Sequence, residues 1–413
     1  MIDKKVLLQK GSVQLIKKIN SNIIIDCIKQ YKNGISRTQI SRELHISKPT
    51  VSKIVNELIQ KNIIINLGKG ITDIGRKPNL IAFNKDYGFI ISLDLGLCLH
   101  KIAVSNLNGE IIEKRRFRTL DLKKEERLEK IISEIIIIRD KFYQKKDTLV
   151  LISIGIPGIV DIEKGTVSYA PNIFPTWDNY PLRKKLEEAL GTTKILIEND
   201  VNLSAFGEFV YYYKKKPANL LFITWSSGVG GGIILNKSIY RGTTGAAGEL
   251  GYSIIRKKGF EYKITDIGYP GYLESIASTG IMISKAQKYA NDKKDSKLYS
   301  SVNGKIEDIS LELIFKLARE NDEFCSTMLN EALQGLIAGI VNGIVFLDPK
   351  IVIIGGDVSD VIFNNEFYIN EITSCIKNYV PFVPLIHFSH LGSDAGIMGG
   401  IAYCLELLND III

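Results

Sequence analysis

Cysteine and histidine are scarce in this 413-residue chain, which holds 5 cysteines and 4 histidines. The cysteines are widely scattered without Cys-x-x-Cys spacing, and the histidines form no metal-ligand pattern. Neither a disulfide framework nor a structural metal is therefore indicated. We expect free, buried thiols in a reducing cytoplasm, with no metal and no cofactor.

Long apolar runs are also missing. No segment approaches the roughly 18 consecutive apolar residues that a membrane-spanning helix needs. Residues 1–12 (MIDKKVLLQKGS) contain no apolar stretch followed by a small-residue cleavage site. We therefore expect no membrane span, no secretion signal and a cytoplasmic location. A hydrophobic content of 45% is enough for sizeable cores, and the length predicts two or three domains.

Negative charge is scarce at the N-terminal end. Residues 1–84 contain 15 Lys and Arg against 5 Asp and Glu, a net charge of +10, whereas residues 85–413 contain 38 against 40, a net charge of −2. A basic segment on a near-neutral body is typical of nucleic-acid binding. We divide the chain accordingly into a DNA-binding domain, residues 1–84, and a body, residues 85–413.

Within the basic segment, residues 36–60 have the pattern of two short helices joined by a tight turn. Ser36, with Gln39 in a capping box, and Ser47 are placed to begin the two helices. The apolar residues of the second helix recur at helical spacing and form one buried stripe. The polar face would lie on double-stranded DNA, in reach of base edges and phosphates. The residues expected to contact DNA here are Arg37, Lys48, Thr50, Ser52, Lys53 and Asn56.

The segment that follows predicts a wing. Two β-rich runs, 62–67 and 79–83, flank a basic, glycine-rich stretch, which is typical of a hairpin with a flexible tip. Arg76 and Lys77 in this tip could enter a minor groove, whose negative potential attracts arginine. Helix pair and hairpin together predict a winged helix-turn-helix. Two alternatives stay open: an ordinary helical hairpin with a solvated basic face, and an interdomain linker in place of the wing.

From Tyr87 onward, strand and helix patterns alternate. An Asn108-Gly109 turn indicates a hairpin near the start, and the interleaving that follows predicts a two-lobed α/β body. Strands are expected at 89–95, 101–107, 111–118, 149–154, 194–198, 220–225, 231–235 and 350–354, and helices at 125–143, 182–190, 310–319, 324–346 and 394–408.

Short motifs follow one another through this body in a specific order. They are Asp94-Leu95-Gly96, GIPGIVD at 155–161, APN at 170–172 with Trp177 after it, ENDVN at 198–202, SSGVGGG at 226–232, AGELG at 247–251, GYLE at 271–274, Asp348-Pro349 and IIGG at 353–356. In their order and spacing, over most of residues 88–408, the chain resembles the ROK family of repressors, open reading frames and sugar kinases. The resemblance implies an actin/hexokinase-like body, and the N-terminal helix pair is similar to that of the repressor branch.

The resemblance also implies a sugar site. The family's END motif supplies an Asn and an Asp that bind sugar hydroxyls, and these match Asn199 and Asp200. Two further acidic positions of the family match Glu249 and Glu274. Carboxylates and amides that meet in a cleft can form hydrogen bonds with sugar hydroxyl groups, because a hydroxyl both donates and accepts. The alternative is that these are solvated surface charges.

The phosphate-binding loops depart from the family's kinases. Those kinases have Asp-x-Gly-Gly-Thr after the first strand, and here Leu97 and Cys98 stand where the second Gly and the Thr would be. In the second loop, Ser226 replaces the first Gly. Glycine lets backbone N–H groups approach phosphate, so the donor phosphates would lose their cradle. We expect no catalytic residues and no kinase activity.

The family's zinc ligands are absent as well. Zinc is held by thiolate or imidazole groups. The one His and three Cys positions of the family are occupied here by Tyr252, Thr265, Ile267 and Tyr272. These side chains are poor zinc ligands, so we expect no zinc.

These observations predict a repressor of carbohydrate-utilisation genes. It would bind a DNA operator as a homodimer or higher homo-oligomer and be released by a monosaccharide inducer, with xylose as the candidate. Whether the sugar is phosphorylated stays open. Two alternatives remain: a ROK sugar kinase with a fused DNA-binding head, which the loop at Leu97 and Cys98 argues against, and a repressor controlled by a protein partner.

Overall fold

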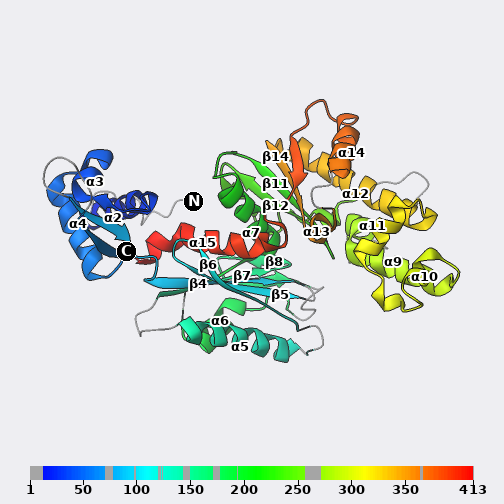
Figure 1. Ribbon diagram of the computed structural model, residues 1–413, viewed down its shortest axis with the longest axis horizontal. Coiled ribbons are helices and arrows are strands. Elements are labelled where there is room, and N and C mark those ends of the chain that lie inside the picture. Colours follow the sequence, from blue (N-terminus) through cyan, green and yellow to red (C-terminus); the bar gives the residue numbers. More distant parts are fainter. Residues whose placement is uncertain are drawn as a thin grey trace.

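The computed structural model describes residues 13–69, 78–96, 99–119, 122, 124–142, 149–170, 177–192, 194–255, 271–362 and 366–412. These residues form a small N-terminal head and two larger α/β lobes, with a long C-terminal helix between the head and the lobes (Figure 1). Several positions discussed above lie outside the described residues: Arg76, Lys77, Leu97, Cys98, Pro171, Asn172, Thr265 and Ile267.

The head has the elements of a winged helix-turn-helix. Ser36 and Ser47 cap α3 and α4, because their hydroxyls accept hydrogen bonds from the N–H groups of Gln39 and Thr50. The capping box is only half formed, since the Gln39 side chain donates to Glu43 instead of reaching back. The strands form a sheet in the order β1-β3-β2. The elements are α2 (Val13–Gln30), β1 (Ile35–Ser36), α3 (Arg37–Leu44), α4 (Lys48–Gln60), β2 (Ile64–Lys69) and β3 (Asn79–Phe83).

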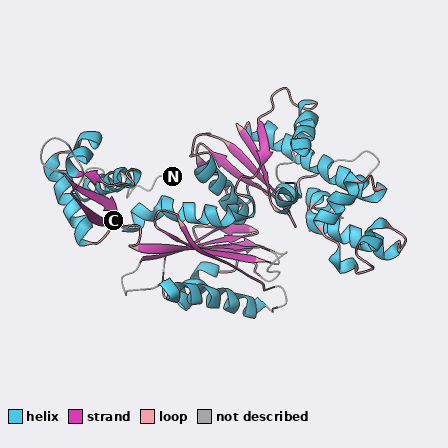
Figure 2. Ribbon diagram, in the orientation of Figure 1, coloured by secondary structure: helices cyan, strands magenta, loops and turns pink. Residues whose placement is uncertain are grey.

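The first lobe is built on a five-stranded sheet in the order β10-β7-β4-β5-β6. Helices α5 and α6 cover one face of this sheet and α15 covers the other (Figures 1 and 2). A small hairpin, β8 and β9, extends from the end of β7. The elements are β4 (Gly88–Leu95), β5 (His100–Asn106), β6 (Ile111–Phe117), α5 (Lys124–Phe142), β7 (Leu149–Ile156), β8 (Ile159–Asp161), β9 (Thr166–Tyr169), α6 (Leu182–Leu190), β10 (Ile195–Asn199) and α15 (Ala395–Ile412).

The second lobe has a five-stranded sheet in the order β13-β12-β11-β14-β15, packed against a cluster of helices (Figure 2). Its strands are β11 (Leu220–Trp225), β12 (Val229–Leu235), β13 (Ser238–Ile239), β14 (Ile351–Gly355) and β15 (Leu385–Phe388). Its helices are α8 (Tyr272–Ala277), α9 (Thr279–Asp292), α10 (Lys297–Ser301), α11 (Leu311–Arg319), α12 (Glu323–Leu347), α13 (Asp357–Val361) and α14 (Glu366–Lys377). The elements 272–292, 297–301, 357–377 and 385–388 are not among those expected from the sequence.

The two sheets repeat one topology. In each, three consecutive strands form an antiparallel meander, and two later strands add in parallel beside the first strand of that meander. The strand order therefore changes direction between β4 and β7 in one lobe and between β11 and β14 in the other. Open sheets of this kind bind ligands beyond the carboxyl ends of the strands at such a reversal. The topology thus marks the loops after these four strands as candidate binding loops.

Two helices join the lobes. Helix α7 (Asp200–Gly207) packs on β11 and β12, while α15 packs on β4 and β7, and the two helices pack against each other. Glycine makes this approach possible: a Cβ at Gly399 would lie 1.7 Å from the Leu203 carbonyl oxygen, and one at Gly400 would lie 2.2 Å from the Ser92 hydroxyl. Helix α7 continues into a π-helical turn, η1 (Glu208–Tyr212).

The head and the first lobe share one hydrophobic core. Ile24 and Ile28 of α2 belong to the same cluster of buried side chains as Cys404, Leu408 and Ile412 of α15. Polar contacts reinforce the junction. Asn409 at the end of α15 donates to Asp26 at 2.6 Å and accepts from the Lys29 ammonium at 2.8 Å.

Helix α12 is long and apolar enough, by length and composition, to cross a membrane. Half of its most apolar stretch is buried within the protein, against α8, α9, α11 and α14, and core helices of globular proteins commonly meet the same criterion. Among the cysteines that the structure describes, Cys27, Cys325 and Cys404 are buried free thiols, as expected, whereas Cys375 is half-buried.

Candidate functional site

The strand ends of the two lobes enclose a cavity of about 730 Å³. Its walls include residues that follow β4, β7, β11 and β14, the four strands at which the strand order reverses. Asn199, Asp200, Glu249 and Glu274, the residues predicted to hold a sugar, all line it. The fold therefore brings together side chains that lie up to 75 positions apart in the sequence.

Asn199 and Asp200 stand where β10 ends and α7 begins. Asn199 caps α7, since its Oδ1 accepts from the Asn202 N–H at 2.9 Å, and its Nδ2 donates to the Gly158 carbonyl at 3.0 Å. Asp200 Oδ1 accepts from the Val201 N–H at 2.9 Å. Much of the hydrogen-bonding capacity of Asn199 is thus used by the protein, and one amide hydrogen and a lone pair remain for a ligand.

Glu249 reaches the cavity on a loop of the second lobe. The loop begins at Arg241, whose carbonyl accepts from the Ala247 N–H at 3.1 Å, and Glu249 precedes the short helix η2 (Leu250–Tyr252). At Gly248 φ is +91°, and a Cβ there would lie 1.9 Å from the Gly231 carbonyl oxygen. The glycine before Glu249 therefore allows the loop to lie directly on β12.

Glu274 comes from the first turn of α8, on the same side of the cavity as Glu249. Its Oε2 accepts from the Val229 N–H at 3.2 Å. Gly251 makes room for this carboxylate, since a Cβ at that position would lie 2.9 Å from the same oxygen. Two carboxyl groups of the second lobe therefore line the same cavity as Asn199 and Asp200.

The cavity raises the pKa of its carboxyl groups. Burial raises the pKa of Asp200 to about 8, and the nearby Asp94 and Glu249 carboxylates add to the rise. Burial, with Glu274 nearby, raises the pKa of Glu249 to about 7, and burial also raises the pKa of Glu274. Near neutral pH some of these groups hold a proton. They can then donate as well as accept hydrogen bonds, which suits a ligand rich in hydroxyls.

The loops after β4 and β11, which correspond to the phosphate-binding loops of the family's kinases, also line the cavity. The Ser226 hydroxyl is bonded to the Asp357 carboxylate, which joins the loop after β11 to the start of α13. Asp94 lines the cavity as well, and burial raises the pKa of its carboxyl group. Lys101 faces Asp94 and bonds the Ser393 carbonyl oxygen. Leu97 and Cys98, which replace the Gly and Thr of the family's first phosphate loop, lie outside the described residues.

The structure describes two of the four positions compared with zinc ligands. Tyr252 is 40% exposed and lines the cavity, whereas Tyr272 is buried at the start of α8. Within the described ranges, no group of three or more His, Cys, Asp or Glu side chains is arranged to hold a metal ion.

In the head, α4 presents the predicted DNA-contacting face. Val51, Ile54, Val55 and Leu58 are buried, and Ile59 is half-buried. On the opposite side Lys48, Lys53 and Asn56 are exposed, while Thr50, Ser52 and Arg37 are half-buried. The Thr50 hydroxyl is 2.8 Å from that of Ser47, so this side chain also belongs to the helix cap. Arg76 and Lys77 of the wing tip lie outside the described residues.

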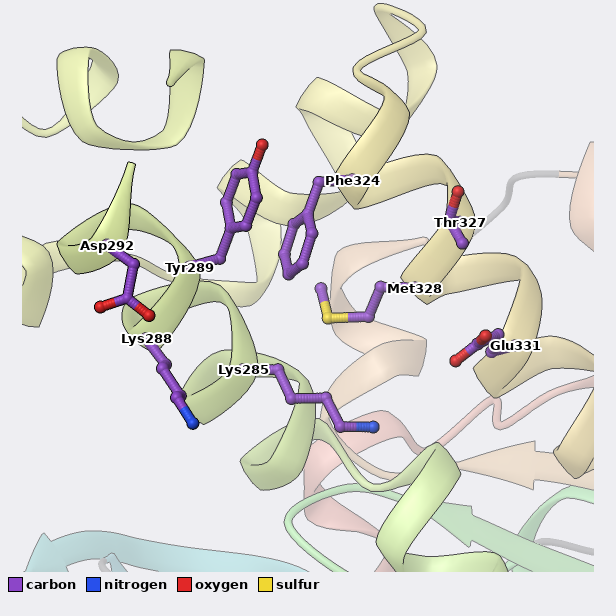
Figure 3. A pocket seen from close by; sticks show the side chains of 8 residues that line it. All are labelled: Lys285, Lys288, Tyr289, Asp292, Phe324, Thr327, Met328 and Glu331. Atoms are coloured by element: carbon purple, nitrogen blue, oxygen red, sulfur yellow. The ribbon is translucent and has the colours of Figure 1, made fainter. Parts of the chain in front are cut away.

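A second hollow lies on the outside of the second lobe, between α9 and α12 (Figure 3). It measures about 360 Å³, and the rings of Tyr289 and Phe324 stack in it with centroids 3.8 Å apart. No residue predicted to bind sugar or DNA lines it. Its lining residues are Lys285, Lys288, Tyr289, Asp292, Phe324, Thr327, Met328 and Glu331.

Sequence reasoning missed a buried ion pair beside the candidate site. Glu198, which is 2% exposed, accepts from Arg241 of the second lobe with an N···O distance of 2.7 Å. Arg241 also donates to the Tyr403 hydroxyl of α15 at 3.3 Å. The one available signal was the position of Glu198 within the strand expected at 194–198, directly before Asn199 and Asp200, because a buried acidic residue is costly unless it is paired.

The comparisons with known proteins agree with this architecture. Residues 90–406 match the ROK family, and residues 23–65 match a winged helix-turn-helix DNA-binding domain, which confirms the resemblance inferred from the motifs. The xylose repressor of Caldicellulosiruptor bescii is 31% identical over 404 residues, covering 96% of this chain and 98% of that protein.

Two further relatives bear on function. A crystal structure of a ROK family transcriptional regulator, a homologue of the Escherichia coli MLC protein, superposes with a TM-score of 0.75 at 25% identity, covering 96% of this chain and 98% of that one. The glucokinase of Thermotoga maritima is 28% identical and covers 77% of this chain and 97% of its own length. The regulators thus match head and body together, whereas the kinase covers a smaller part of this chain.

The raised pKa of Asp200 predicts how stability depends on pH. Between its ordinary pKa of 3.8 and about 8, the folded protein keeps a proton that the unfolded chain releases, so the free energy of unfolding should decrease as pH rises. Asp200→Asn has no proton to lose. Its free energy of unfolding in urea should decrease less between pH 5 and 9 and exceed the wild-type value at pH 9.

The matched control is Glu188→Gln, which removes an exposed carboxylate of α6 and should keep the wild-type pH dependence. An unchanged pH dependence in Asp200→Asn would show that Asp200 is not held in a buried, proton-retaining environment.

Proposed function

We propose that this chain, which belongs to the ROK family, is a sugar-responsive transcriptional repressor of carbohydrate-utilisation genes in the cytoplasm. The carrying observation is that one chain joins a winged helix-turn-helix to a cavity lined by Asn199, Asp200, Glu249 and Glu274. The head binds an operator in double-stranded DNA, and a monosaccharide in the cavity weakens that binding. Xylose is the candidate inducer, because the xylose repressor of Caldicellulosiruptor bescii matches both head and body.

The charges in the cavity favour an uncharged sugar. Six carboxyl groups line the cavity: Asp94, Asp200, Glu249, Glu274, Asp357 and Asp360. Two cationic side chains, Lys101 and Arg116, line it as well. A phosphate dianion would lose hydration in this partly desolvated space and would be repelled by the carboxyl groups that are ionised, which is unfavourable. Neutral hydroxyls meet no such penalty.

The same geometry favours a regulator over a kinase. Phosphoryl transfer needs donors that cradle the phosphates and neutralise the charge that develops on them. Here the Ser226 hydroxyl is bonded to Asp357, and Leu97 and Cys98 replace the Gly and Thr of the family's first phosphate loop. Because the glucokinase of Thermotoga maritima is a relative of this chain, a sugar kinase with a fused DNA-binding head remains the alternative to be tested.

Release from DNA requires that the sugar bind two arrangements of the lobes unequally, since equal affinity shifts no equilibrium. The sugar-contacting groups lie on both lobes, so closure around a ligand would favour one arrangement. The head shares its core with the first lobe, so closure of the lobes would carry the head along with the first lobe. In a dimer, closure would change the spacing of the two recognition helices and put them out of register with successive major grooves.

We propose a homodimer joined through the second lobe. Operators of helix-turn-helix proteins are two-fold symmetric, which a dimer matches. Val345 and Phe346 at the end of α12 and Leu385 at the start of β15 are 56%, 85% and 61% exposed. They lie on neighbouring segments, because Leu385 pairs with Ile351, a few residues beyond α12. Apolar side chains exposed together mark interaction surfaces, and a second copy is the partner that operator symmetry calls for.

Variants of α4 test the DNA interface. Asn56→Ala should relax base preference at one position of a duplex selected with the wild-type protein, with a loss of about 1–3 kcal/mol if Asn56 bonds a base. Lys53→Ala should reduce the salt dependence of binding, because it removes a cation that neutralises phosphate. Fluorescence anisotropy at two salt concentrations measures both. Lys184→Ala, an exposed lysine of α6, is the control, and wild-type binding by both α4 variants would contradict this interface.

Asp200→Asn tests the sugar site. It should keep operator affinity but weaken D-xylose binding by about 0.5–1.5 kcal/mol, because the amide replaces a carboxyl group that bonds the sugar. Operator release should then need more sugar. Anisotropy over a D-xylose titration measures this, with Asp295→Asn, an exposed aspartate of the second lobe, as control. A full response in Asp200→Asn would place the effector elsewhere and favour a protein partner.

Sugar-dependent ATP turnover by the wild-type protein on the order of 1–100 per second would favour the alternative of a sugar kinase.

Phe346→Lys tests the dimer surface. The wild-type protein should have the mass of a dimer by light scattering, and the variant that of a monomer, because a buried lysine without a partner is costly. Operator affinity of the variant should also fall, because a monomer presents only one DNA-binding head. Ile112→Lys, at a 52% exposed position on β6 of the first lobe, should leave the dimer intact. A dimer that persists in Phe346→Lys would exclude this surface.

A further inference from the structure

The ion pair between Glu198 and Arg241 joins the two walls of the cavity. Glu198 is the last residue but one of β10, directly before Asn199 and Asp200, and Arg241 begins the loop that ends at Glu249. The guanidinium bonds Glu198 Oε2 through two nitrogens, with a closest N···O distance of 2.7 Å. The pair therefore connects the strand that carries Asp200 to the loop that carries Glu249.

Glu198 holds the beginning of α7 in place as well. Its Oε1 accepts from the Asn199 N–H at 3.0 Å and from Asn202 Nδ2 at 3.1 Å. Because Glu198 is 2% exposed and Arg241 is 23% exposed, solvent screens this interaction little. If the Glu249 loop moves relative to α7, the ion pair persists only if Arg241 and Glu198 stay together. Separation of this buried ion pair would be strongly unfavourable.

Arg241 also contacts the helix that leads to the head. Its Nη2 donates to the Tyr403 hydroxyl at 3.3 Å, and its guanidinium carbon lies 5.8 Å from the centre of the Tyr403 ring. Tyr403 packs edge-on against Phe206 of α7, with ring centroids 6.1 Å apart. One guanidinium group thus contacts both the sugar-site strand and α15.

From Tyr403, α15 runs about 9 Å further to Asn409, at 1.5 Å per residue. Asn409 bonds Asp26 and Lys29 of α2 in the head. Next to Tyr403, Cys404 is fully buried in the core that head and first lobe share. Figure 1 shows α15 (red) extending from the region of α7 to the head. A continuous series of described contacts therefore connects the cavity to the DNA-binding domain.

We propose that Arg241 is a positioning residue that couples sugar occupancy to the head through Glu198 and Tyr403. The proposal rests on the proposed function and adds the route by which the two sites communicate. A sugar held between Asp200 and Glu249 sets the distance between the two walls. Arg241 lies on one wall and is paired with Glu198 on the other, so a change in this distance moves its guanidinium group relative to Tyr403. Helix α15 then transmits the displacement to α2 of the head. None of these three side chains contacts DNA, and none is among the residues expected to hold the sugar.

Two variants test the route without leaving a buried charge unpaired. Tyr403→Phe keeps the ring beside the guanidinium but removes the hydroxyl that Arg241 bonds. The double variant Glu198→Gln with Arg241→Gln replaces the ion pair by two neutral amides, so neither charge is left alone in a buried site. Tyr240→Phe is the matched control, because Tyr240 precedes Arg241 and is 46% exposed.

The measurement is the coupling between two ligands of the full-length protein. Calorimetry gives the affinity for D-xylose, and anisotropy gives the affinity for the selected duplex with and without saturating D-xylose. The ratio of the two DNA affinities is the coupling factor. Both test variants should lower this factor at least fivefold while sugar affinity changes less than threefold, and Tyr240→Phe should keep the wild-type factor. A merely structural role would instead lower both affinities and the melting temperature together.

The outcomes are separable. A wild-type protein whose DNA affinity does not respond to any of D-xylose, D-glucose and N-acetylglucosamine contradicts the proposed function itself. A wild-type protein that responds, with Tyr403→Phe and the double variant retaining the wild-type coupling factor, contradicts this inference alone. Should the double variant fail to fold, Tyr403→Phe decides by the same criterion.

Discussion

The structure depends on the close packing of α15. An apolar stripe of Ile397, Ile401, Cys404, Leu408 and Ile412 is buried along its length. On the sides that meet α7 and β4, glycines stand where any Cβ would collide, at Gly396, Gly399 and Gly400. Close contact over several turns holds this helix firmly against the first lobe, since packed interiors do not deform continuously. This one rigid helix therefore fixes the positions of three parts of the protein: the sheet of the first lobe, the helix α7 that carries Asp200, and the head.

The candidate site follows from the duplicated topology of the lobes. Each sheet reverses its strand order once, and the loops at the two reversals face each other. Such a cavity gathers side chains from sequence-distant loops, and here most of the ionisable ones are acidic. Their mutual proximity and burial raise the pKa values of Asp200 and Glu249. The same features that suit the cavity to hydroxyl groups make it unsuited to a nucleoside triphosphate without compensating cations.

Much of the fold could be predicted from the sequence, because its signals are local. Alternating apolar residues and turn signals located the strands at 220–225 and 111–118 within a residue of their observed bounds, and Ser36 and Ser47 marked the helix starts in the head. Helix α7 was missed because it is short and its polar residues, Asp200, Asn202 and Ser204, alternate with apolar ones, which hides the helical period. The strand at 62–67 was placed two residues early, since the turn after α4 occupies Asn62 and Ile63.

For the site, the resemblance supplied the four cavity residues, but their interplay needed three-dimensional information. The partner of Glu198 lies 43 positions away, and Tyr403 lies a further 162 positions along the chain. No local pattern links them. Likewise, the role of Asn199 as a helix cap, which uses much of its hydrogen-bonding capacity, appears only once the start of α7 is known.

The core shared by the head and the first lobe bears on how such proteins can be recombined. A hybrid regulator made by joining the head of one relative to the body of another at residues 84 and 85 would divide a continuous hydrophobic cluster, in which Ile24 and Ile28 pack with Leu408 and Ile412. Mismatched halves would leave cavities or overlaps costing about 1–5 kcal/mol at each poorly fitted position. A transferable head therefore includes the last turns of α15, the C-terminal end of the chain, together with its N-terminal segment.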